Sequence, residues 1–148
     1  MIKVGIAVVI FCTLGILGYR HGVSGRFAKD WEQMQILAAA ESDTYEVDLK
    51  DVQGIRTLSH GENKKRLLQL IVSVAQEGEK KEIPDKNTPA IGIRIIEKEG
   101  DFQAMFWVYD LGEETDMGVF QTENGTYSMK NCGEVLNYLA ELGCATER

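Results

Sequence analysis

Cysteine and histidine side chains are the groups in this chain with the most reactive chemistry, because they act as nucleophiles, proton carriers and zinc ligands. The chain holds three cysteines and two histidines in 148 residues. Cys132 and Cys144 flank a predicted helix, and 12 residues of helix span about 18 Å. That separation is too long for a disulfide. No Cys-x-x-Cys pair occurs, and neither histidine is near these thiols in sequence, so we predict no disulfide framework and no metal site.

One alternative is that the protein is an uncharacterised enzyme or accessory subunit. Its site would then lie near His60 and would be formed by scattered carboxylates such as Asp48. The chain lacks the Gly-x-Ser-x-Gly, Ser-x-x-Lys and His-Glu-x-x-His motifs and the glycine-rich phosphate loops. The acidic group Glu113, Glu114 and Asp116 has too few ligands at the wrong spacing for calcium. We therefore predict no catalytic residue and no cofactor.

Aromatic residues are concentrated between Phe102 and Asp110, in the sequence FQAMFWVYD. Alternation along a strand places Phe106 on one side and Trp107 on the other. The Phe106 side is expected to face the core, and both sides are expected to be at least partly covered. On the second side, Met105, Trp107 and Tyr109 are candidate residues for binding a partner protein or peptide. Ordinary cross-strand packing is the alternative.

The elements that would position these residues follow from hydrophobic periodicity. Strands are predicted at 45–50, 55–58, 91–96, 102–110, 118–122 and 126–129, and helices at 26–40, 62–76 and 135–142. Asn124-Gly125 predicts a hairpin with positive φ at both turn positions. The spacing of Ser59 with Glu62, and of Asn131 with Glu134, matches capping boxes. Glu77–Pro89 is predicted to be a loop. The fold class is α+β: a small antiparallel sheet with about two packed helices, following an N-terminal membrane helix.

The N-terminal region contains 16 uncharged residues, Val4–Tyr19, with Lys3 before them and Arg20 after them. A helix from Met1 to Tyr19 would be about 28 Å long, enough for a thin bilayer. We predict an uncleaved membrane anchor, and a cleaved signal sequence is the alternative. The anchor residues are Val4, Ile6, Val8, Val9, Ile10, Phe11, Leu14, Ile16, Leu17 and Tyr19.

Three segments result: a membrane anchor or signal at 1–21, a linker and amphipathic helix at 22–43, and a compact acidic α+β domain at 44–148. The helix predicted at 26–40 either lies in the membrane interface, with Trp31 at headgroup depth, or packs on the domain. The formal net charge of -7 disfavours nucleic acid as a partner. The domain is expected outside the cytoplasm. The basic residues after the apolar stretch leave the cytoplasmic side as the alternative.

From Ile91 onward, the aromatic strand, Gly118-Val119-Phe120, the tight hairpin and the helix Val135–Leu142 resemble small membrane-anchored or lipoprotein-type bacterial proteins of unknown function. The resemblance implies no catalytic residues. Phe11 stands before Cys12 where a lipoprotein signal requires a small residue, so the lipid anchor is not expected here. We predict a non-enzymatic, membrane-tethered protein-interaction or binding module. Two alternatives to this module remain. One is an immunity or inhibitor-type protein that uses an acidic face, and the other is the enzyme or accessory subunit described above.

Overall fold

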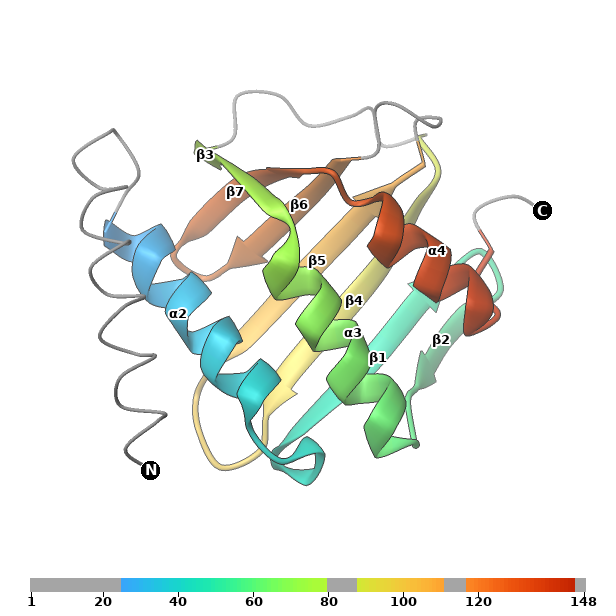
Figure 1. Cartoon of the computed structure of the whole chain (residues 1–148), viewed down its shortest axis with the longest axis horizontal. Coiled ribbons are helices and arrows are strands. Elements are labelled where there is room, and N and C mark those ends of the chain that lie inside the picture. Colours follow the sequence, from blue (N-terminus) through green and yellow to red (C-terminus); the bar gives the residue numbers. More distant parts are fainter. Residues whose placement is uncertain (1–24, 80–87, 111–116, 146–148) are drawn as a thin grey trace.

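A computed structural model of the protein describes residues 25–79, 88–110 and 117–145, with the side chains of 75–79 left out. The predicted anchor residues from Val4 to Tyr19 and the acidic cluster at 113–116 lie outside these ranges. The described residues form a seven-stranded sheet with three helices packed on one of its faces (Figure 1). This arrangement confirms the predicted α+β class with an antiparallel sheet. None of the helices within the described ranges is long and apolar enough to cross a membrane.

The strands are β1 (Tyr45–Asp51), β2 (Gly54–Thr57), β3 (Ala75–Glu79), β4 (Ala90–Glu97), β5 (Gln103–Tyr109), β6 (Met117–Thr122) and β7 (Gly125–Lys130). Their order across the sheet is β2-β1-β4-β5-β6-β7-β3, and every neighbouring pair is antiparallel. The helices are α2 (Gly25–Ala39), α3 (Gly61–Ser73) and α4 (Gly133–Glu141), with a short 3-10 turn, η1 (Ser42–Thr44). Helix α3 carries the chain from β2 at one edge of the sheet to β3 at the other (Figure 1).

The core lies between the sheet and the three helices. Alternate residues of the strands point into it, as the period-two pattern predicts. The buried strand residues include Tyr45, Val47, Leu49, Ile91, Ile93, Ile95, Phe106, Val108, Phe120, Tyr127 and Met129. The helices contribute the apolar stripes that bury against them, among them Phe27, Met34, Leu67, Leu68, Ile71, Val135 and Leu139. A single continuous core therefore joins all three helices to one face of the sheet.

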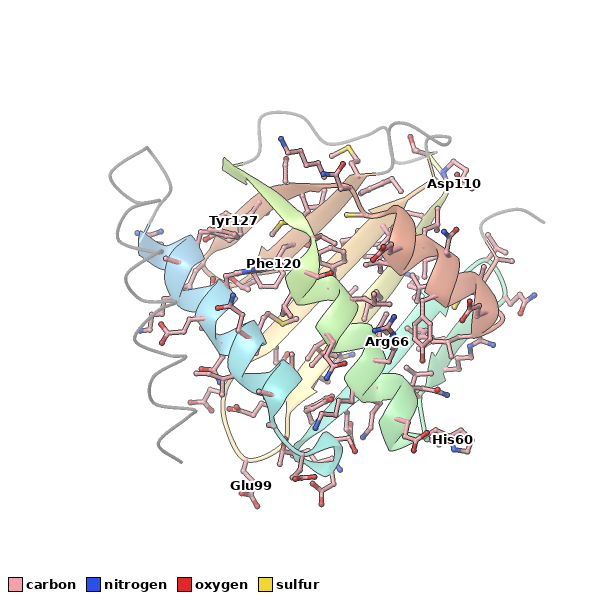
Figure 2. The ribbon with its side chains drawn as sticks, in the orientation of Figure 1. His60, Arg66, Glu99, Asp110, Phe120 and Tyr127 are labelled. Carbon is pink, nitrogen blue, oxygen red and sulfur yellow. The ribbon has the colours of Figure 1, made fainter. Side chains whose placement is uncertain are left out.

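Helix α2 is part of this core, so three helices cover the sheet rather than the predicted two. Trp31 is only 4 % exposed, and its ring centroid lies 5.2 Å from that of Phe120. The ring centroids of Phe27 and Tyr127 are 4.6 Å apart. Phe120 and Tyr127 fill the space between α2 and the sheet (Figure 2). Of the two predictions for this helix, packing on the domain is the one observed, because Trp31 is inside the core.

Strand β3 was not predicted, and the helix before it is shorter than expected. The sequence predicts a helix to Gln76 followed by a loop, whereas α3 ends at Ser73 and the chain enters β3 at Ala75. The sequence AQEGE of β3 has no apolar alternation to signal a strand. It pairs antiparallel with β7, with a register shift between Gln76 and Gly78. The open backbone groups of β7 therefore impose strand structure on a polar segment.

The β6–β7 hairpin is present, but the prediction of its turn is wrong. Thr122 pairs with Gly125, so the turn residues are Glu123 and Asn124. Positive φ occurs within the described residues at Gly54, Asn131 and Gly143, and neither turn residue is among them. Here side chains fix the turn: the Asn124 N–H donates to Thr122 Oγ1 at 3.1 Å, and Asn124 Nδ2 donates to Asp30 Oδ1 at 3.0 Å. These bonds replace the backbone preference that an Asn-Gly turn exploits.

Both predicted capping boxes are also wrong. The N-cap residues are His60 for α3 and Cys132 for α4, and neither makes a side-chain capping hydrogen bond. Ser59 is one position too early to cap α3. Asn131 adopts a φ of 61°, which turns the chain out of the geometry that a capping box needs. Each helix is therefore held by its buried apolar stripe rather than by a side-chain cap.

Candidate functional site: the open face of the sheet

The second face of the sheet points away from α2, α3 and α4, and no helix in the described ranges covers it (Figure 1). We call it the open face. Its central side chains are apolar: Met105, Trp107, Tyr109 and Met117 are half-buried, and Val119 is 3 % exposed. At the β2 edge, Ile55 is 71 % exposed. Apolar side chains are unusual on a sheet face that no helix covers, because such a face normally carries polar residues.

Strand register places Trp107 in the middle of a row that crosses six strands. The row is Ile55, Lys50, Gly92, Trp107, Val119 and Ser128. The indole of Trp107 lies across Gly92, because a Cβ atom placed on that glycine would be 2.8 Å from Cζ3 of the ring. The Nζ of Lys50 lies 5.9 Å from the ring centroid, within range of a cation–π interaction. The indole therefore packs over Gly92 of β4, with the Lys50 ammonium of β1 beside it.

The neighbouring rows bring the predicted partner-binding residues together and add to them. One row contains Asp48, Arg94, Met105, Gln121 and Thr126, and another contains Ala90, Tyr109, Met117 and Lys130. Met105, Trp107 and Tyr109 thus lie on one side of β5, as predicted. Met117 and Val119 on β6 complete the apolar centre, and the sequence analysis missed them. The alternation of Met117, Val119 and Gln121 against Gly118 and Phe120 is the signal that identifies them.

Charged residues surround this apolar centre. Lys50, Arg94 and Lys130 are exposed on the open face, together with Glu46. Asp48 is half-buried, and its Oδ1 accepts a hydrogen bond of 2.7 Å from Thr57 Oγ1. Burial raises the pKa of the Tyr109 hydroxyl. Among the described residues, the open face therefore carries three cations and two carboxylates, although the whole chain has a net charge of -7.

The residues proposed for chemistry are not assembled into a site. His60 lies at the N-terminus of α3 and points away from the domain (Figure 2). Cys132 and Cys144 are buried and are not joined by a disulfide, which agrees with the prediction. Within the described part of the chain, no group of three or more His, Cys, Asp or Glu residues could hold a metal ion.

Beside the open face, a cavity of about 480 Å³ lies at the end of the sheet where β5 begins and β6 ends. Met105 and Arg94 belong to both the cavity and the open face. Its wall on the helix side is Asp30 of α2, which is 5 % exposed. Thr122 Oγ1 donates to Asp30 Oδ2 at 2.6 Å, so this carboxylate ties α2 to the β6–β7 turn.

The open face thus combines a half-buried apolar and aromatic centre, a surround of charged residues and an adjoining polar cavity. No protein-family model, no characterised protein and no solved structure matches the chain.

Proposed function

We propose that the protein is a non-enzymatic, membrane-tethered binding module that holds a partner protein or peptide on the open face, around Trp107. The observation that carries the proposal is the apolar centre of Met105, Trp107 and Tyr109 on a sheet face without a described helix. Contiguous apolar surface with a polar rim is typical of protein interaction sites. Tryptophan, tyrosine and arginine are also the residues that contribute most to binding at such sites.

The shape and charge of the open face support one kind of partner over others. Because the indole of Trp107 already packs over Gly92 with Lys50 beside it, binding orders few additional rotamers and loses little entropy. Lys50, Arg94 and Lys130 favour a partner that presents an apolar group within an acidic rim. They disfavour a basic partner on this face, so the immunity or inhibitor-type alternative finds no support here.

The tether belongs to the proposal as a separate part. The uncharged stretch Val4–Tyr19 supports insertion into a membrane, and the short basic N-terminus supports export of the α+β domain. Alkaline carbonate extraction of cell membranes tests the anchor: the full chain is expected to stay with the membrane pellet. A reporter fused after Arg148 tests the side of the membrane. Recovery of the chain in the carbonate supernatant would contradict the tether while leaving the open face unaffected.

Site-specific photo-crosslinking in intact cells tests the binding surface. The full chain is produced with p-benzoylphenylalanine in place of Trp107 or Tyr109. Matched control positions are Asn137, exposed on α4, and Ile36, which is 39 % exposed on α2. We expect one crosslinked product of defined size from positions 107 and 109 and none from the two controls.

Charge reversal provides the second arm of this experiment. Lys50→Glu and Lys130→Glu are expected to reduce the crosslinked product, since they remove the charges that attract an acidic rim. Equal products at all four positions would indicate contact without specificity. Products that join the position to the same chain, to a second copy or to lipid would also contradict the proposal.

A further inference from the structure

The cavity beside the open face exists because two strands part at this end of the sheet. Met105 and Gln121 form the pair of β5 and β6 closest to this end. Beyond that pair, β6 turns at Thr122 toward β7, whereas β5 continues back to Gln103 and Phe102. Glu99 in Figure 2 marks the β4–β5 turn at the same end of the sheet. The gap between the strands holds the volume of about 480 Å³, within the range of about 300–1,000 Å³ typical of small-molecule sites.

A buried carboxylate forms the inner wall of the cavity. Both oxygens of Asp30 accept a hydrogen bond, from Thr122 Oγ1 at 2.6 Å and from Asn124 Nδ2 at 3.0 Å. Both of these donors are neutral. They fix the position of the Asp30 carboxylate but do not neutralise its negative charge. A buried carboxylate without a cation is costly, and each of its oxygens can accept more than one bond. The wall therefore favours a positively charged group in the cavity.

The remaining lining contains charges of both signs that are not used by the fold. Asp101 and Glu123 are exposed at the mouth, and Arg94 lines the cavity from β4. Among the residues that the structure describes, none of the three has an ion-pair partner. Asp48 is opposite Arg94 in the sheet register, but its carboxylate accepts from Thr57. The described lining of the cavity thus presents three carboxylates and one guanidinium, so carboxylates outnumber cations here, whereas cations outnumber carboxylates among the described residues of the open face.

We propose that this cavity binds a basic amino acid, such as arginine or lysine. Arg94 pairs with the carboxylate of the ligand, because a guanidinium fits a carboxylate through two parallel hydrogen bonds. Asp101 and Glu123 bind the cationic groups of the ligand, and the buried charge of Asp30 also attracts these groups. The side chains of Phe102 and Met105 offer apolar surface to the aliphatic stem. The site goes beyond the binding function proposed for the open face, with which it shares Arg94 and Met105.

A ligand series separates these contacts. The purified full chain in detergent is titrated by isothermal titration calorimetry with L-arginine, with agmatine, which lacks the carboxylate, and with L-citrulline, which lacks the side-chain cation. L-glutamate serves as the acidic control. We expect saturable binding of arginine, binding weaker by about tenfold for agmatine and for citrulline, and none for glutamate, because each deletion removes one charge-assisted pair.

Protein variants then assign each contact to a residue. Arg94→Gln is expected to weaken arginine by about tenfold and to leave agmatine unchanged, since agmatine has no carboxylate to lose. Asp101→Asn combined with Glu123→Gln is expected to weaken both ligands. Glu141→Gln, exposed on α4, is the matched control and should change neither. All four positions are exposed, and circular dichroism checks that each variant folds like the parent.

Three results would overturn the proposal. One is the absence of saturable binding of arginine to the folded parent chain. Another is an equal loss of arginine and agmatine affinity in Arg94→Gln, because that would place Arg94 away from the ligand carboxylate. The third is binding of glutamate as tightly as arginine, which would mean that the carboxylates of the cavity do not determine the ligand.

Discussion

Two consecutive residues of strand β5 lie on opposite faces of the sheet, and the two faces differ in character. Phe106 points to the helices and is completely buried, whereas Trp107, its neighbour, lies half-buried on the open face. Phe106 belongs to the core formed by the sheet and the helices, whereas Trp107 is flanked by residues of its own sheet, Gly92 and Val119. A residue of the first kind stabilises the fold, and a residue of the second kind is, in the function we propose, the one that contacts a partner. Truncation of neighbouring aromatic residues should therefore have very different consequences.

The largest expected difference is between Phe106→Ala and Trp107→Ala. We expect Phe106→Ala to lower the free energy of unfolding by about 4 kcal/mol, since it leaves a cavity in a closed core. Trp107→Ala should lower it by about 2 kcal/mol, because the indole leaves part of its surface exposed and its loss opens no closed cavity. Urea unfolding of the full chain in detergent, followed by circular dichroism, measures both. Equal losses would indicate that Trp107 is a core residue and not part of a binding surface.

Two glycines extend the comparison to backbone positions. A Cβ at Gly118 would lie 2.9 Å from Phe106 Cζ and from Cys132 Sγ, both inside the core. Gly118→Ala should cost about 2 kcal/mol, because neither neighbour has room to move. A Cβ at Gly92 would meet the indole of Trp107, which can lift from the open face, so Gly92→Ala should cost less than about 1 kcal/mol. Thermal unfolding gives the cost, and a changed Trp107 emission spectrum would report the lifted ring.

Carboxylates at the cavity provide the next contrast. Asp30 holds the β6–β7 turn through Thr122 and Asn124, and Asp101 makes no such bonds within the described residues. Asp30→Ala should therefore lower the free energy of unfolding by about 2 kcal/mol, because Thr122 and Asn124 both lose their buried acceptor. Asp101→Ala should change it by less than about 0.5 kcal/mol. Denaturant unfolding of the pair provides the measurement, and a larger loss at Asp101 would reverse the assignment of the two roles.

The smallest expected effect concerns pH and the buried Tyr45. Burial raises the pKa of Tyr45 from 10.0 to about 12, and its hydroxyl has no hydrogen-bond partner among the described residues. Since the folded pKa exceeds the unfolded one, stability is complete below pH 10 and falls as pH rises toward 12. We expect a loss of about 1 kcal/mol between pH 10 and 11. Tyr45→Phe should remove this loss and, at pH 7, stabilise the fold by up to about 1 kcal/mol.

Tyr109→Phe on the open face is the matched control for that experiment. Burial also raises the pKa of Tyr109, but this residue is only half-buried. Its replacement should leave most of the alkaline loss in place. Unfolding in urea between pH 8 and 11 compares the two variants. An alkaline slope that survives in Tyr45→Phe and disappears in Tyr109→Phe would show that the open face, rather than the core, controls the pH response.

The sequence predicts the covered face better than it predicts the ends of the elements. The alternation of Tyr45, Val47 and Leu49, and the stripe of Phe27, Trp31 and Met34, identify core residues because burial produces the same period as the backbone. Strand β3 carries no such period, since its structure comes from pairing with β7. The β6–β7 turn depends on Asp30, 94 residues before Asn124 in the chain, so a local preference at Asn124-Gly125 gave the wrong geometry.

The candidate sites show the same division. Met105, Trp107 and Tyr109 were predictable because they lie on one strand. Met117 and Val119 reach the same surface through the register of β5 and β6, which the sequence does not specify by itself. The cavity was not predictable at all. Its Asp30, Arg94 and Asp101 come from α2, β4 and the β4–β5 turn, and the parting of two strands brings them together.

Oxidative footprinting in membranes tests the central claim, that the covered face is filled by the fold and the open face by a partner. Hydroxyl radicals label exposed methionine and tryptophan, so Met105 and Trp107 report on the open face, and Met34, fully buried, reports on the core. Labelling is measured by mass spectrometry on the full chain in native membranes and after purification in detergent. We expect Met105 and Trp107 to be protected in native membranes and labelled after purification, with Met34 unlabelled in both. Equal labelling of Met105 and Trp107 in both preparations would contradict the account.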